Sequence, residues 1–124
     1  MNHQIAFKVD IKPVGTNSAY KKRPYGYGLF MTEEAKAYKK AVGEAAQIAM
    51  EEAGLGDFWL ESPAVGLTFT FGNKRGLDID SGVKLTLDSM NKIVWKDDAE
   101  IRWLLVKKLY KKDCPSVTVQ VAGD

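Results

Sequence analysis

The sequence predicts an α+β domain in which two helices pack on a single mixed sheet. Three stretches alternate apolar and polar residues, as half-buried strands do: 5–11, 64–71 and 116–121. A longer segment, 32–54, places its apolar residues three and four apart, which is the spacing of a helix. The predicted order is strand, helix, strand, helix, strand, strand, within one domain spanning residues 1–124.

The first strand is predicted from "IAFKVDI", in which Ile5, Phe7 and Val9 lie on one face and Lys8 on the other. The segment that follows, residues 12–28, is rich in Gly, Pro and Asn and predicts a long loop. Loops of this length in a compact domain are often functional.

The first helix has a clear beginning and end in the sequence. Thr32 is a suitable N-cap, and Glu33 and Glu34 supply acidic side chains to the first turn, where the helix dipole favours them. Gly54 is the expected C-terminal stop. The many alanines between these ends predict close packing of this helix against the sheet.

The second half of the chain predicts three more strands and a second helix. Residues 64–71 alternate cleanly, and after a glycine-rich turn a helix is expected to begin near residues 78–81. Residues 101–110 have the apolar density of a buried strand, and residues 116–121 alternate as the last one.

Composition excludes several kinds of chemistry and location. With one cysteine, Cys114, and one histidine, His3, neither a Cys/His zinc site nor a histidine-dependent triad is expected. No apolar run approaches the ~20 residues that span a bilayer, so no membrane association is expected. The lone cysteine and the absence of a secretion-signal pattern favour the cytoplasm. Carboxylates, lysines and a hard metal ion are left to carry any catalysis.

The densest set of charged residues lies in "GLDIDSGVKLTLD", residues 76–88, with an acidic pair shortly downstream. Its members are Asp78, Asp80, Lys84, Asp88, Asp97 and Asp98. In an extended stretch Asp78 and Asp80 would point the same way, and Asp80, Lys84 and Asp88 are spaced to share one helical face. One interpretation is a solvated helix face, with an N-cap and exposed ion pairs worth ~0.3–0.5 kcal/mol each.

The other interpretation is a catalytic site. Two carboxylates ~4 Å apart repel by roughly 4 kcal/mol at an effective dielectric constant near 20, so a convergent set needs a cation. Aspartates without nearby His or Cys favour Mg²⁺ or Mn²⁺, which suit phosphodiester hydrolysis. In such a site Lys84 would stabilise the transition state.

Basic residues gather in two loops, although the net charge is only +2. The clusters are Lys21, Lys22 and Arg23 in the first loop, and Lys74 and Arg75 before the acidic set. Such clusters bind phosphates in many proteins, and they equally often only solvate a turn, so both interpretations stay open.

These residues resemble the RusA family of Holliday junction resolvases, small endonucleases of bacteria and prophages. "IKPVGTNSAY" is similar to the N-terminal segment of the family, "DIDSGVKLTLDSM" to its acidic hallmark and "VWKDDAEI" to its second acidic motif. The resemblance implies a homodimer that cuts four-way DNA junctions with Mg²⁺ or Mn²⁺, in DNA recombination and repair.

Carried over by position, the resemblance assigns a role to each acidic residue of the set. It implies metal-binding carboxylates at Asp78, Asp80 and Asp98, which share the catalytic site with the lysine at Lys84. Asp88 and Asp97 match the pattern as supporting acids.

The sequence departs from the family pattern at two places. Ser81 replaces the family's Asn after the paired aspartates, and the basic run before them is reduced to "NKRG". These departures keep an alternative open, in which the same fold binds branched DNA without cutting it.

Overall fold

A computed structural model describes residues 2–15, 19–22 and 29–124. Its main sheet has the strand order β1, β6, β4, β5. In chain order the four strands are β1 (His3–Val9), β4 (Ala64–Phe71), β5 (Trp103–Tyr110) and β6 (Ser116–Gly123). Strand β6 pairs antiparallel with β1 and β4, whereas β4 and β5 run parallel. This mixed sheet with packed helices confirms the predicted α+β class.

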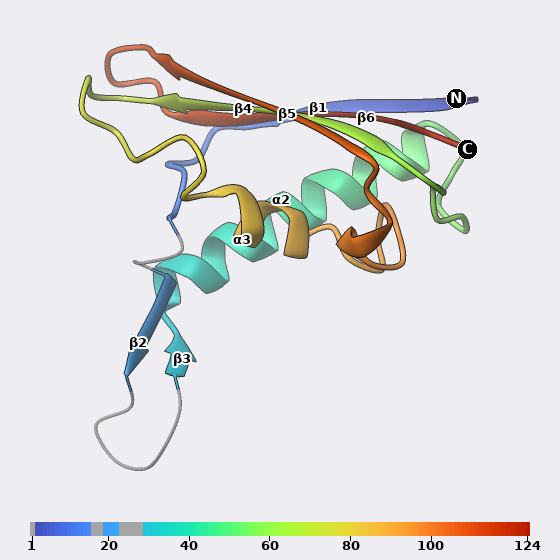
Figure 1. Cartoon of the computed structure of the whole chain (residues 1–124), viewed down its shortest axis with the longest axis horizontal. Helices are drawn as coiled ribbons and strands as arrows, with labels where there is room; N and C mark the ends of the chain where they lie inside the picture. Colours follow the sequence, from blue (N-terminus) through green and yellow to red (C-terminus); the bar gives the residue numbers. More distant parts are fainter. Residues whose placement is uncertain (1, 16–18, 23–28) are drawn as a thin grey trace.

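The helices α2 (Glu33–Glu52) and α3 (Val83–Asp88) lie on the same side of the sheet (Figure 1). A short 3₁₀ helix, η1 (Asp98–Glu100), leads into β5. The core fills the layer between sheet and helices, because the alternating strands turn their apolar residues to that side: Val65, Leu67 and Phe69 of β4 are at most 2% exposed.

Helix α2 begins as predicted and ends two residues before Gly54. The Thr32 hydroxyl accepts a hydrogen bond from the Ala35 N–H at 3.2 Å, and Gly54 has the left-handed φ of 75° that stops a helix. No helix of the described segments is long and apolar enough to cross a membrane.

A glycine lets α2 lie close to the segment after α3. A Cβ atom at Gly43 would lie 3.2 Å from the Ser89 carbonyl oxygen and 3.4 Å from Cδ1 of Ile93. A buried hydrogen bond joins the same two helices, since the Tyr38 hydroxyl lies 2.6 Å from Oγ1 of Thr86. The α2–α3 contact is therefore tight, and it fixes the position of α3.

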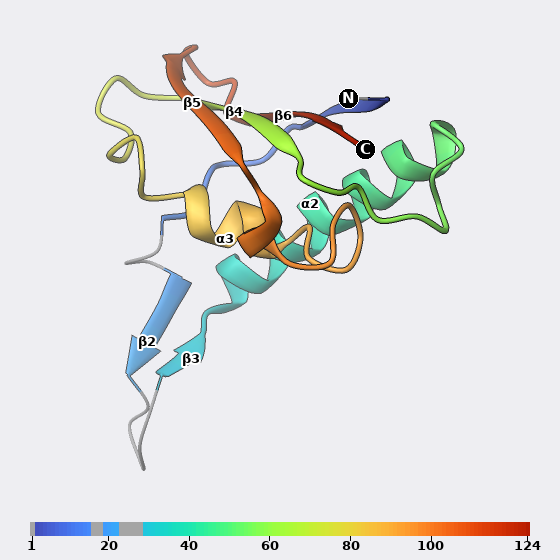
Figure 2. The ribbon, with the colours of Figure 1, turned by 45° about the vertical axis from the view of Figure 1, so that its right-hand side comes forward.

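The prediction of a structureless loop over residues 12–28 is wrong in part. Strands β2 (Tyr20–Lys22) and β3 (Leu29–Met31) pair antiparallel and form a two-stranded ribbon. The Ala19 carbonyl accepts a hydrogen bond from the Thr32 N–H at 2.8 Å, which ties the ribbon to the start of α2. Figure 2 shows the ribbon projecting away from the main sheet.

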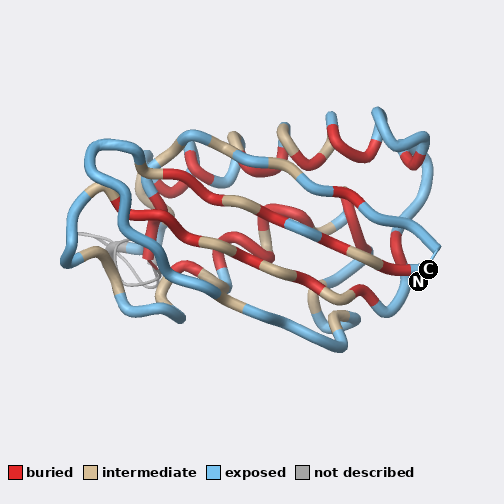
Figure 3. Tube along the Cα trace, turned by 90° about the horizontal axis from the view of Figure 1, so that it is seen from above, coloured by how far each residue is buried: buried red, intermediate tan, exposed pale blue. Residues whose placement is uncertain are grey.

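The strand predicted at residues 101–110 is present, but the prediction that it is buried is wrong. Strand β5 does pair in parallel with β4, but it is the last strand of the sheet and is exposed along almost its whole length (Figure 3). Trp103 is 56% exposed and Leu105 is 45% exposed. The apolar density was correctly recognised, but within the described residues nothing lies beyond this edge to bury it.

Candidate active site

The Lys84 ammonium group lies between two carboxylates. Its Nζ atom is 2.9 Å from Oδ1 of Asp88, one turn further along α3, and 2.8 Å from Oδ2 of Asp98. The Asp88 contact follows from the predicted four-residue spacing. The Asp98 contact shows that the segment after α3 brings the acidic pair back next to this helix.

These contacts shift two pKa values in opposite directions. Hydrogen bonds to Asp98 and then Asp88 raise the pKa of Lys84, so this group stays a cation at neutral pH. The hydrogen bond from Lys84 lowers the pKa of Asp98, and a further hydrogen bond from Asn91 acts in the same direction. The Asp98 side chain is only 16% exposed, yet this pairing keeps it ionised.

Buried Trp95 supports Asp98 through Asn91, and this support was not predicted from the sequence. The Trp95 indole N–H donates to Oδ1 of Asn91 at 2.8 Å, and Nδ2 of Asn91 lies 3.5 Å from Oδ1 of Asp98. Trp95 is fully buried and so provides a fixed anchor. The only hint in the sequence was an amide residue four positions before a tryptophan near the acidic pair.

Asp97 has a structural role in this arrangement. It is the N-cap of η1, and its Oδ1 accepts a hydrogen bond from the Ala99 N–H at 3.0 Å. This cap stabilises the turn that places the Asp98 side chain next to Lys84. Asp97 thus supports the site by shaping the turn.

Asp78 and Asp80 lie in turns before α3, not on an extended strand or on the helical face. The Asp78 carbonyl accepts from the Ser81 N–H at 3.0 Å, and the Asp80 carbonyl accepts from the Val83 N–H at 3.2 Å. The prediction that Asp80 begins the helical face is therefore wrong, since α3 starts at Val83. Both side chains are exposed and make no ion pair with the described part of the chain.

The three predicted metal ligands supply the right donors for a hard divalent cation but are not gathered around one point. Carboxylate oxygens suit Mg²⁺ and Mn²⁺, and Asp98 is kept ionised by its partners. Over residues 2–15, 19–22 and 29–124, however, no three His, Cys, Asp or Glu side chains converge as a metal cluster. The three residues therefore suit Mg²⁺ or Mn²⁺ by the kind of ligand atom that they carry, and not by their arrangement.

The turn before the acidic segment is built around an asparagine and a glycine. Oδ1 of Asn73 accepts hydrogen bonds from the N–H groups of Arg75 and Gly76, at 3.1 and 2.8 Å. Gly76 has a φ of 53°, and a Cβ atom there would lie 2.8 Å from the Phe71 ring, so only glycine fits. This turn exposes the predicted DNA contacts Lys74 and Arg75.

The other predicted DNA contacts lie in or beside the two-stranded ribbon. The backbones of Lys21 and Lys22 belong to β2, whereas Arg23 lies outside the described residues.

An apolar hollow of about 420 Å³ adjoins the site. Asp80 and Lys84 are its charged lining residues, and its apolar wall is formed by residues in and just before α3 and by residues of β5. The apolar lining residues are Ile79, Val83, Leu87, Leu104 and Val106. The candidate site thus combines one cation, several carboxylates and an apolar surface at the exposed edge of the sheet.

The chain is similar to a known family of proteins. No curated protein sequence matches the chain. A family profile described as Endodeoxyribonuclease RusA matches residues 10–122, a range that begins just after β1 and includes the whole acidic set, β4, β5 and all of β6 but its last residue. A match over nearly the whole length shows that this chain belongs to the RusA family of endodeoxyribonucleases.

Proposed function

We propose that this protein is a Mg²⁺-dependent endodeoxyribonuclease that resolves four-way DNA junctions in recombination and repair, in the cytoplasm. Family membership supports the nuclease activity. The observation that carries the assignment to this site is Lys84, whose ammonium lies within 2.9 Å of both Asp88 and Asp98. A permanent cation on an exposed side chain is suited to a phosphodiester substrate.

Lys84 is proposed to act as an electrostatic group. Because its pKa is raised, it holds its proton at neutral pH and is a poor general base. During hydrolysis a water oxygen bonds to phosphorus, the bond from phosphorus to one sugar oxygen breaks, and that oxygen takes up a proton. Lys84 would stabilise the negative charge that builds on the phosphoryl and leaving oxygens.

Asp78, Asp80 and Asp98 are the proposed Mg²⁺ ligands, with Mn²⁺ as a substitute. Bound there, the cation would polarise the phosphoryl group and lower the pKa of a water molecule. The proposal rests on the family match and on the hard oxygen donors of these three residues. Asn91 and Trp95 would keep the Asp98 carboxylate oriented for this purpose.

DNA contacts are proposed for the two basic loops. Lys74 and Arg75 are exposed on the turn directly before the acidic segment. Lys21, Lys22 and Arg23 belong to or adjoin the projecting ribbon. Contacts of this kind position the phosphate backbone without reading its sequence.

A homodimer is proposed through the exposed edge of β5. Long, apolar edge strands pair readily with other strands, so native proteins cover or interrupt them. Antiparallel pairing of β5 with β5 of a second copy would use the same surface twice and close the assembly. It would also cover the hollow beside Lys84, since Leu104 and Val106 of β5 form part of its wall.

The test is a cutting assay on a labelled four-way junction, a matched linear duplex and a 5′ flap, each with Mg²⁺ and with EDTA. Lys84→Ala and Asp80→Asn are compared with Lys8→Ala, which removes an exposed lysine on β1. We expect paired nicks confined to the junction, lost with EDTA and with both site variants, and retained by the control variant.

Two other outcomes would overturn parts of the proposal. Junction binding without cutting in Mg²⁺ or Mn²⁺ would assign the chain to the alternative, a branched-DNA-binding module, and Ser81→Asn would be the first restoration to try. Loss of junction binding in Asp80→Asn would contradict its catalytic role, because removing a negative charge near phosphate should not weaken binding.

A further inference from the structure

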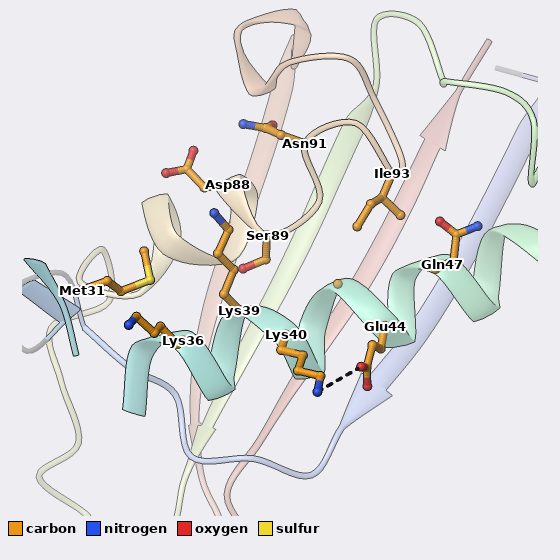
Figure 4. A pocket seen from close by; sticks show the side chains of 11 residues that line it. Met31, Lys36, Lys39, Lys40, Glu44, Gln47, Asp88, Ser89, Asn91 and Ile93 are labelled. Atoms are coloured by element: carbon orange, nitrogen blue, oxygen red, sulfur yellow. Dashed lines mark ion pairs between the residues drawn. The ribbon is translucent and has the colours of Figure 1, made fainter. Parts of the chain in front are cut away.

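A groove with a volume of about 760 Å³ runs between α2 and the end of α3 (Figure 4). One wall is formed by three lysines of α2, and the other by polar residues that follow Lys84. The residues used below are Lys36, Lys39, Lys40, Asp88, Ser89 and Asn91. Neither the sequence motifs nor the proposed function assigns a role to these lysines.

The lysines face the groove because of helical spacing. Lys36, Lys39 and Lys40 fall three and four residues apart, and the same stripe continues through Gly43 to Gln47. Gly43 forms the floor, where α2 lies against the Ser89 carbonyl. The stripe therefore turns toward α3, while the neighbouring helix face packs in the core.

Neighbouring acidic residues only partly neutralise the positive charge of the three lysines. Lys36 pairs with Glu33 at 3.3 Å and Lys40 with Glu44 at 3.9 Å, and all four side chains are more than half exposed. Exposed pairs of this kind are weak and exchange readily for other anions. Lys39 forms no ion pair with any residue in the described segments, and Figure 4 shows it rising from α2 toward Ser89.

The groove is continuous with the candidate active site. Asp88 and Asn91 line the groove, and both also belong to the network around Lys84: Asp88 pairs with the ammonium, and Asn91 contacts Asp98. The Lys84 ammonium group, which does not line the groove, therefore partly neutralises the negative charge of Asp88. A chain of phosphates that reaches Lys84 along this path meets the three α2 lysines first.

We propose that the groove is a phosphate track, in which Lys36, Lys39 and Lys40 bind the sugar–phosphate backbone of the DNA strand that is cut at Lys84. This inference rests on the proposed nuclease function. Charge complementarity favours a polyanion, and lysine ammonium groups on flexible stems contact phosphates as point charges. The track therefore holds DNA without regard to its sequence.

The test measures junction binding in metal-free buffer, by fluorescence anisotropy over 50–200 mM salt. The variants are Lys39→Gln, the triple Lys36→Gln/Lys39→Gln/Lys40→Gln and, as control, Lys8→Gln on β1. Each phosphate contact contributes about 0.9 to the slope of log K against log salt for duplex DNA. The triple variant should lower the magnitude of that slope by roughly 2 to 3, Lys39→Gln by about 1, and the control not at all.

A variant that is expected to bind the junction more tightly distinguishes a change in phosphate contacts from misfolding. Glu44→Gln removes the acid beside Lys40, so junction binding should tighten, whereas Glu52→Gln at the far end of α2 should leave it unchanged. Melting temperatures are measured for every variant. A variant that fails to fold cannot produce tighter binding.

The outcomes separate the two proposals. A wild-type protein that binds no junction overturns both the nuclease function and the track. A wild-type protein that binds and cuts, with a triple variant of unchanged salt slope, overturns the track alone. An unchanged slope together with loss of cutting in the triple variant likewise excludes phosphate binding by these lysines.

Discussion

Nζ of Lys84 lies 2.8 Å from Oδ2 of Asp98, and this contact joins two residues that are fourteen positions apart in the sequence. It brings α3 and the acidic pair before β5 into one network. The contact depends on the turn capped by Asp97 and on the buried anchor Trp95.

Replacing Lys84 by alanine should abolish most cutting while leaving junction binding largely intact. Loss of one charge-stabilising group typically lowers turnover by roughly 10²–10³-fold. Lys84→Arg keeps the cation but changes its shape, so an intermediate rate is expected. Single-turnover cutting and anisotropy on the same junction measure the two effects, and weaker binding without slower cutting would contradict the assigned role.

Asn91→Ala should loosen Asp98 and weaken the response to metal. Loss of a residue that orients a metal ligand typically costs about 10–100-fold in metal affinity or activity. Because Asn91 acts through Asp98, the expected signature is a higher Mg²⁺ concentration for half-maximal cutting. The NMR signal of the Trp95 indole N–H should also shift, since it loses its acceptor.

A merely structural role for Asn91 predicts a different result. The melting temperature would then fall while the Mg²⁺ dependence of cutting stayed the same. Asn91→Asp provides the matched variant, because it keeps an acceptor for the indole N–H and loses the amide that reaches Asp98.

Leu105→Asp should produce a monomer. Leu105 is 45% exposed on the edge strand, and a charged side chain on an edge strand opposes its pairing with another strand. Ile48→Asp is the matched control, because Ile48 is 54% exposed on α2, and this helix packs against β1 at the opposite edge of the sheet from β5. Sedimentation should show a dimer for the wild type and the control, and paired nicking should be lost only in Leu105→Asp.

A wild-type monomer in sedimentation at working concentration would contradict the dimer proposal. An equally dimeric Leu105→Asp protein would keep the dimer and move its interface away from β5.

Local sequence patterns were sufficient for most of the fold. Alternation in β4 and β6 and the capped, three-and-four spacing of α2 are properties of neighbouring residues, so they were predictable. The exposure of β5 was not, because it depends on whether another strand or helix lies beyond the edge. The β2–β3 ribbon was not predicted, because the many glycine and proline residues around these short strands indicate a loop.

The candidate site, like the fold, was predictable only where neighbouring residues in the sequence determine a contact. The Lys84–Asp88 pair follows from helical spacing alone. The Lys84–Asp98 contact and the support from Trp95 depend on how the chain returns after α3, which spacing does not encode. Lys39 was not predicted as a candidate binding residue, because its place in the wall of a groove depends on the position of α3.

The hydrogen bond between Tyr38 and Thr86 should make stability depend on pH in the alkaline range. Oγ1 of Thr86 donates to the Gly82 carbonyl at 2.7 Å, so the Tyr38 hydroxyl is the donor toward Thr86. Burial raises the pKa of Tyr38 to about 12, because the charged phenolate would be poorly solvated in the core. The folded state therefore keeps its proton at a pH where the unfolded state has lost it.

The sign of the effect follows from this linkage. The contribution of Tyr38 is fully present below pH 10, and it is lost as the pH rises from 10 through 12, by about 2 kcal/mol. Denaturant unfolding at pH 8 and pH 11 measures the free energy of unfolding in both ranges. Tyr38→Phe should lose about 1 kcal/mol at pH 8 and fall less steeply toward pH 11 than the wild type.

Thr86→Val is the matched variant for the same hydrogen bond. It leaves the Tyr38 hydroxyl buried without an acceptor, which costs ~1–3 kcal/mol, so it should destabilise more than Tyr38→Phe at pH 8. Tyr38→Phe leaves Thr86 with its bond to Gly82 and strands no donor. Equal losses in the two variants, or a Tyr38→Phe protein as alkali-sensitive as the wild type, would refute a buried, proton-holding Tyr38.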